Sequence, residues 1–226
     1  EAGETVEKFC REFGIPFGET QAGKSACRSS DENCLGGIGV TGTLSANRIA
    51  AEADCVIAVG SRLSDFTTAS KWLFGRRDIR IVTINNSRFH ACKMDAVKAV
   101  GDAKRTLLSL SERLRERGYH SSYTTEIREA KEMWEREMER LSGIRCTGPD
   151  FEPMIRERDP RTIPEFLEKT GGQITQTAAI AALRRLMPED GIVITAGGSL
   201  PSCMQRMWTT DKRGAYHAEY GYSCMG

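Results

Sequence analysis

Short apolar runs separated by helical segments constrain the fold of this chain more than any other feature of its sequence. The runs occupy residues 55–59, 79–84 and 97–100, and Gly or Asn directly follows each of them. Apolar residues in 103–114 then recur at the spacing of one helix face. Strands that alternate with helices are joined by crossover connections, which produce a parallel sheet covered by helices. The sequence therefore predicts an α/β domain built on a parallel sheet.

Helical periodicity also predicts helices over residues 5–13, 44–53 and 124–142, and the last of these is highly charged with one apolar stripe. Residues 143–174 hold Gly, Pro and mixed charges with weak periodicity, which is typical of an interdomain linker. We therefore predict a first domain over residues 1–142, followed by this linker.

The remainder of the chain begins a second α/β unit. The pattern predicts a helix over residues 175–187, a strand over 192–195, a helix from about Pro201 and a strand near 215–217. Because the sequence supplies no further strand, we expect residues 175–226 to be the incomplete start of a second domain.

Composition excludes two classes of partner. The 226 residues carry 32 Lys+Arg against 31 Asp+Glu, so the basic surface of a nucleic-acid-binding protein is not expected. No apolar run approaches the ~20 residues of a membrane-spanning helix. The chain opens at Glu1 without Met or an export leader and closes at Gly226, so we expect a piece of a longer cytoplasmic protein.

The cysteines and histidines do not indicate a metal site. None of the eight cysteines has the CxxC spacing of a zinc site or redox motif, so we expect reduced thiols. Cys55 begins the run 55–59, where a thiol would pack as a small hydrophobic group. The three histidines, His90, His120 and His217, lie far apart and in no motif, so each is expected at the surface or in packing.

Residues 18–42 are polar and rich in glycine, and this long predicted loop contains two motifs. Residues 18–25 match the phosphate-binding pattern GxxxxGK[ST], which needs a firm strand before it and a helix starting at the Lys-Ser pair. The preceding segment is short and contains Pro16, and residues 26–32 lack apolar periodicity. We therefore favour a coincidental match over a phosphate-loop nucleoside triphosphatase.

Residues 37–42 match the dinucleotide fingerprint GxGxxG and open onto a predicted helix. The fingerprint also needs an apolar strand before its first Gly and an acidic residue ~20 positions later. We expect no strand at 34–36, and the next strand ends in Gly60-Ser61-Arg62 rather than in a carboxylate. These glycines are interpreted as a tight packing turn, with NAD or FAD binding as the alternative.

The order of these segments resembles the central domain of thiamine-diphosphate enzymes such as acetolactate synthase. The resemblance rests on residues 19–25, 37–47 and 53–63, and residues 192–208 resemble the opening of the family's C-terminal cofactor domain. It implies a Rossmann-like central domain of the NAD/FAD-binding type, followed by the start of a thiamine-diphosphate-binding domain.

Within the family, residues 65–68 and 217–226 look closest to enzymes that hydrolyse a C–C bond of a cyclic dione in inositol catabolism. An acetolactate-synthase-like enzyme and a separate nucleotide-binding module are the alternatives. The resemblance implies thiamine diphosphate and Mg²⁺ as cofactors of the parent enzyme, a small-molecule substrate, and a homodimer or homotetramer. It places the activating Glu and the Mg²⁺ ligands outside this chain, so we expect the isolated chain to hold no catalytic residue and to bind no cofactor.

The resemblance also implies five cofactor-binding residues. Gly198, Ser199 and Leu200 match the position where relatives contact the diphosphate, although Ser-Leu stands where relatives often carry Gln-His. Ser223 matches a residue whose backbone carbonyl meets the aminopyrimidine amine. Met225 matches the bulky residue beneath the bent cofactor, and a plain core methionine is the alternative interpretation.

Overall fold

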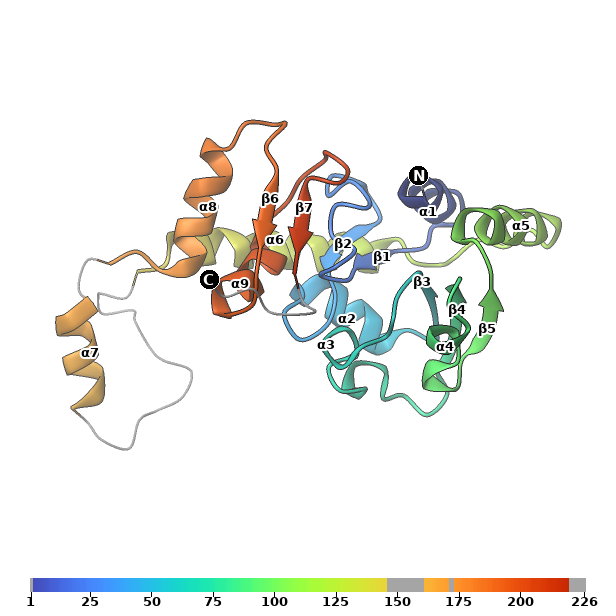
Figure 1. Ribbon diagram of the computed structural model, residues 1–226, viewed down its shortest axis with the longest axis horizontal. Helices are drawn as coiled ribbons and strands as arrows, with labels where there is room; N and C mark the ends of the chain where they lie inside the picture. Colours follow the sequence, from blue (N-terminus) through green and yellow to red (C-terminus); the bar gives the residue numbers. More distant parts are fainter. Residues whose placement is uncertain (1, 146–160, 171–172, 220–226) are drawn as a thin grey trace.

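The computed structural model describes residues 2–145, 161–170 and 173–219, and Figure 1 shows their helices and strands. Three strands, β3 (Cys55–Val59), β4 (Arg80–Asn85) and β5 (Val97–Val100), form a sheet in the order β3-β4-β5. Both pairings are parallel. The predicted parallel sheet is therefore confirmed, with each strand within one residue of its expected range.

Helices cover both faces of this sheet. Ile84 packs with Phe9 of α1 (Ala2–Phe13) and Leu107 of α5 (Ala103–Glu116). Ile81 lies on the opposite face and packs with Leu73 of the short helix η1 (Trp72–Phe74). Successive residues of a strand point to opposite faces of the sheet. The continuous apolar run of β4 therefore packs against the helices on both faces. Three further short helices complete this region: α3 (Asp65–Thr68), α4 (Arg88–Ala91) and η2 (Lys93–Asp95).

The expectation that Cys55 is buried is wrong. Cys55 is exposed because it is the first residue of β3, and β3 lies at an edge of the three-stranded sheet. Burial along β3 begins with the residues that follow it and is complete at Ala58.

The predicted loop at 18–42 also needs correction, because it contains two strands. β1 (Phe17–Glu19) and β2 (Cys34–Gly37) pair in parallel. Leu35 is buried against Ile49 of α2 (Leu44–Glu52), whose first turn is capped by the Thr43 side chain. Two glycines in a four-residue strand conceal its β character in the sequence. The strand is recognised by its burial beneath α2, a contact between separate elements that the periodicity of the sequence does not reveal.

The C-terminal unit comprises α8 (Gln176–Leu186), β6 (Val193–Thr195), α9 (Ser199–Met207) and β7 (Tyr216–Ala218). β6 and β7 pair in parallel, and their inward residues pack with Ile180, Met204 and Trp208. All four elements agree with the predicted ones, although α9 begins two residues before Pro201.

A long helix, α6 (Thr125–Gly143), runs behind both regions in Figure 1. Ile127 near its start packs with Ile49 of α2, whereas Met138 and Leu141 near its end pack on the core around Ile180. The predicted apolar stripe of this charged helix therefore joins the N-terminal domain to the C-terminal unit. The segment predicted as a linker contains a further helix, α7 (Thr162–Thr170). None of the described helices is both long enough and apolar enough to cross a membrane.

Candidate functional site

Three of the predicted cofactor residues, Gly198, Ser199 and Leu200, lie where β6 leads into α9. This turn follows the carboxyl end of a parallel strand, which is where open α/β sheets bind ligands. Gly198 caps the helix with φ 126°, a backbone conformation that favours glycine. All three residues are exposed, so the turn is accessible to a ligand.

The turn offers main-chain donors rather than charged side chains. The first amides of an α-helix have no intrahelical acceptor, and together they attract anions such as phosphate. Pro201 removes one of these donors because it has no amide hydrogen. The Gln176 side chain donates to Ser199 Oγ at 3.0 Å, which orients that hydroxyl at the helix start. The turn therefore fits part of a diphosphate, and the remaining ligands would have to come from elsewhere.

The other two predicted cofactor residues, Ser223 and Met225, lie outside the described residues. Their assigned contacts with the aminopyrimidine and beneath the cofactor stay predictions. Within residues 2–145, 161–170 and 173–219, no three His, Cys, Asp or Glu side chains are arranged to hold a metal ion.

The loop at 18–25 does not form a phosphate site. A phosphate-binding Lys-Ser pair must face its ligand at the start of a helix, but turns rather than a helix follow here. Lys24 is 4% exposed, and its ammonium lies 5.8 Å from the centroid of the Tyr216 ring. Ser25 is 1% exposed and bonds to the backbone of Tyr216. The interpretation of this motif as a coincidental match is therefore confirmed.

Glu19 and Lys24 are two buried ionisable groups in the same loop. Burial raises the pKa of Glu19, and the positive charge of Lys24 opposes that change. Burial lowers the pKa of Lys24, with the Glu19 carboxylate acting in the opposite direction. Glu19 Oε1 accepts a hydrogen bond from the Cys27 amide at 3.2 Å, whereas Oε2 has no partner among the described residues. An incompletely paired buried carboxyl makes folding stability depend on pH.

The glycine motif at 37–42 is a packing turn, as predicted. A Cβ atom on Gly39, whose φ is 103°, would lie 2.1 Å from the Phe66 carbonyl oxygen. A Cβ atom on Gly42 would lie 2.5 Å from the Gly37 carbonyl oxygen. The Asn47 side chain closes the turn by accepting from the Gly39 amide and donating to the Gly39 carbonyl. The glycines are thus required by neighbouring protein atoms.

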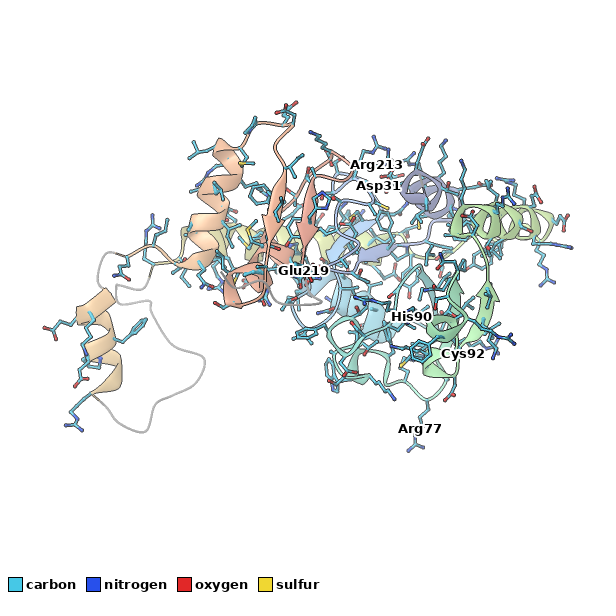
Figure 2. All side chains as sticks on the ribbon, viewed as in Figure 1. Asp31, Arg77, His90, Cys92, Arg213 and Glu219 are labelled. Atoms are coloured by element: carbon cyan, nitrogen blue, oxygen red, sulfur yellow. The ribbon has the colours of Figure 1, made fainter. Side chains whose placement is uncertain are left out.

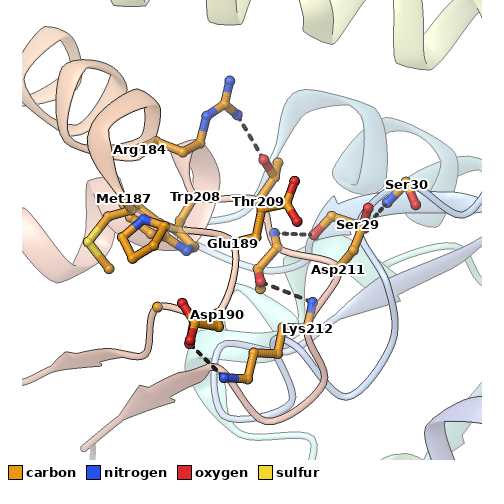
Figure 3. A pocket seen from close by; sticks show the side chains of 13 residues that line it. Ser29, Ser30, Arg184, Met187, Glu189, Asp190, Trp208, Thr209, Asp211 and Lys212 are labelled. Atoms are coloured by element: carbon orange, nitrogen blue, oxygen red, sulfur yellow. Dashed lines mark hydrogen bonds between the residues drawn. The ribbon is translucent and has the colours of Figure 1, made fainter.

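Two hollows lie near these motifs. One of about 310 Å³ lies beyond the carboxyl ends of β1 and β3, and among its lining residues Arg62 alone is charged. The larger one, about 730 Å³, is a groove between the turn after α8, the segment after α9 and Ser29 (Figure 3). The lining of this groove favours neither an anionic nor a cationic ligand, because it mixes positive and negative side chains. The charged lining residues are Arg184, Glu189, Asp190, Asp211 and Lys212.

Sequence reasoning missed the residues that join the C-terminal unit to the N-terminal domain. Glu7 of α1 accepts from Arg213, and Gln205 of α9 reaches the backbone of Ile38. Figure 2 places Arg213 at the side of the C-terminal unit that faces α1. His90, a residue of α4, and Cys92, which caps the end of α4, lie in the region of the three-stranded sheet, away from the C-terminal unit. No local signal could have revealed these pairs, because their members are more than 160 positions apart.

Comparison with known proteins assigns the N-terminal domain to a family. Residues 1–110 match the family described as thiamine pyrophosphate enzyme, central domain. These residues belong to that family. Thiamine pyrophosphate is another name for thiamine diphosphate, so the resemblance found in the sequence is confirmed. The parallel α/β sheet is the fold expected for this central domain.

Curated relatives extend the similarity through the C-terminal unit. The 3D-(3,5/4)-trihydroxycyclohexane-1,2-dione hydrolase 2 of Bacillus cereus (strain ZK) is 54% identical over 226 residues. Hydrolase 1 of the same strain is 53% identical, and the hydrolase of Bacillus thuringiensis (strain Al Hakam) is 52% identical. Each alignment covers 100% of this chain and 35% of the relative. The chain therefore spans about a third of the length of these relatives.

Proposed function

We propose that this chain is part of a thiamine-diphosphate-dependent enzyme that hydrolyses a C–C bond of a cyclic 1,2-dione in inositol catabolism. The observation that carries the proposal is the identity of 52–54% to the three named hydrolases over all 226 residues. That identity extends beyond the family match at 1–110 into the unit that holds Gly198, Ser199 and Leu200. Hydrolysis between two ring carbonyls adds the elements of water and leaves a carboxylic acid and an aldehyde on one open chain.

Thiamine diphosphate, when bound, would supply a nucleophilic carbon for a carbonyl group and an electron sink for the broken C–C bond. The role of this chain is to hold and orient that cofactor. The amides of Ser199 and Leu200 would donate to diphosphate oxygens, and Gly198 would let the backbone approach them. From the resemblance, the Ser223 carbonyl would accept from the aminopyrimidine, and Met225 would pack beneath the cofactor.

In this proposal the chain supplies no catalytic acid or base. Residues 1–142 are the central domain, 143–174 the linker and 175–226 the opening of the cofactor-binding domain. The activating Glu and the Mg²⁺ ligands belong to other parts of a longer homodimer or homotetramer. A cytoplasmic location fits the six described cysteines, all of which are free thiols.

Two alternatives lead to different chemistry. An acetolactate-synthase-like enzyme would share the fold and cofactor but join two 2-oxo acids. A nucleotide-binding module would use the 310 Å³ hollow beside Arg62, which lies at the sheet edge where such ligands bind.

The deciding experiment uses the full-length enzyme that contains this chain. With thiamine diphosphate and Mg²⁺, we expect 3D-(3,5/4)-trihydroxycyclohexane-1,2-dione to be converted to an open-chain acid, detected by mass spectrometry as a gain of one water. Pyruvate serves as the matched substrate control and should not be consumed. Consumption of pyruvate without dione hydrolysis would favour the synthase. Micromolar binding of FAD or NAD by the 226-residue chain in calorimetry would favour the module.

A further inference from the structure

The two glycine-rich motifs of the N-terminal domain both contact the C-terminal unit. At the first motif, Ser25 Oγ accepts from the Tyr216 amide at 3.0 Å. The Ser25 carbonyl accepts from the Gly214 amide, also at 3.0 Å. Ser25 is 1% exposed, and the hydrogen bonds it makes fix the start of β7.

The chain just after this motif continues the contact. The Ser29 amide donates to the Thr210 carbonyl at 3.1 Å, and the Thr210 amide donates to Ser29 Oγ at 3.0 Å. The Ser30 amide donates to the Asp211 carboxylate at 2.8 Å. The segment leading into β7 is therefore held by a series of hydrogen bonds from residues 25–30.

The second motif receives the side chain of Gln205 from α9. Gln205 Nε2 donates to the Ile38 carbonyl at 3.2 Å, and Thr41 Oγ1 donates to Gln205 Oε1. Gln205 is 2% exposed, and a Cβ atom on Gly37 would lie 3.0 Å from its side chain. The nitrogen and the oxygen of the buried Gln205 side-chain amide are both paired. Leaving either atom without a partner would cost free energy, so these hydrogen bonds hold α9 in place.

We propose that these two motifs and the segment just after the first form a docking surface, made of Ser25, Ser29, Ile38 and Thr41, that positions α9 and β7 of the C-terminal unit. The surface holds α9, which begins at Ser199, and β7, which Ser223 and Met225 follow in the sequence. It thereby sets the diphosphate turn at the start of α9 relative to β7. Gln205 and Ser25 are positioning residues that do not touch the cofactor. The cofactor part of this inference rests on the proposed function.

Thr41→Val tests the docking surface because it removes one hydroxyl and keeps the shape of the side chain. Thr83→Val is the matched control, since the Thr83 hydroxyl donates to the Ala91 carbonyl within the N-terminal domain. In the 226-residue chain, Thr41→Val should speed amide hydrogen exchange in α9 about five- to tenfold and leave β3–β5 unchanged. Thr83→Val should do the reverse. Unchanged exchange in α9 of Thr41→Val would overturn the docking surface.

The second measurement uses the full-length enzyme and its apparent Kd for thiamine diphosphate at fixed Mg²⁺. We expect Thr41→Val to raise that Kd several-fold with kcat retained at saturating cofactor, and Thr83→Val to leave both unchanged. Equal Kd values for the two variants would overturn the positioning role. Failure of the unmodified enzyme to bind thiamine diphosphate would instead overturn the proposed function, and hydrogen exchange alone would then decide the docking surface.

Discussion

The guanidinium of Arg213 donates to the carboxylate of Glu7, which lies 206 positions earlier in the chain. The Glu7 side chain is 3% exposed and also accepts from the Arg28 amide at 2.7 Å. One buried carboxylate on α1 thus holds both the loop after β1 and the connection into β7. This ion pair lies beside the hydrogen bonds of Ser25 and Ser29, so charge and hydrogen bonding fix the C-terminal unit together.

Replacing Glu7 by Gln should destabilise the chain by about 2 kcal/mol. The substitution removes a buried negative charge that pairs with Arg213 and Arg28, and the loss is limited because both arginines are partly exposed to solvent. The free energy of unfolding in urea measures the change. Glu12→Gln on the same helix is the matched control, since its ion pair with Arg115 lies at the surface and should matter much less. Equal effects of the two substitutions would contradict the role given to Glu7.

The glycine motif predicts a contrast between two alanine substitutions. Gly39→Ala should cost more than about 3 kcal/mol, because its Cβ atom would collide with the Phe66 carbonyl in a left-handed backbone conformation. Gly60 also has a positive φ, 65°, but its new Cβ atom would lie in open space. Gly60→Ala should therefore lower the free energy of unfolding by only about 1–2 kcal/mol. Thermal unfolding of both variants tests this order, and a Gly39→Ala chain as stable as Gly60→Ala would refute the packing interpretation.

Glu19 predicts a pH dependence of stability. Burial raises the pKa of this carboxyl in the folded chain, whereas the unfolded value is near 4.5. The folded chain therefore holds the proton more tightly, and the stabilisation from Glu19 is full below pH 4.5 and is lost as pH rises through the folded pKa. Relative to the unmodified chain, Glu19→Gln should therefore gain stability in urea unfolding experiments as the pH is raised above 4.5.

Glu126→Gln is the control of opposite sign for that experiment. Backbone amides, including that of Thr124, hold the pKa of Glu126 below its usual value. The stabilisation from Glu126 is therefore present above the unfolded pKa and is lost as pH falls, so this variant should lose stability relative to the unmodified chain as pH rises. Parallel pH profiles for the two variants would contradict the environment described for Glu19.

Thiol reactivity should divide five of the six described cysteines into a buried and an exposed group. Burial raises the pKa of Cys10 and of Cys34 to about 12, and that of Cys27 also rises. At pH 8 an alkylating reagent should therefore modify exposed Cys55 and Cys92 well before these three. Mass spectrometry of peptides gives the rates, and labelling in urea checks that every thiol reacts once unfolded. Rapid labelling of Cys34 in the folded chain would show that β2 is not buried as described.

The sequence by itself determined the local elements and the family. The runs at 55–59, 79–84 and 97–100 specified a parallel sheet because a continuous apolar strand must be covered on both faces. The motif order specified the thiamine-diphosphate-enzyme resemblance.

Tertiary structure decided what those patterns could not report. Cys34 to Gly37 became a strand only because α2 and Gln205 cover it. Lys24 was buried against Tyr216, and Glu7 met Arg213, because folding brought distant segments together. Periodicity records contacts within an element, whereas contacts across nearly two hundred positions leave no local trace.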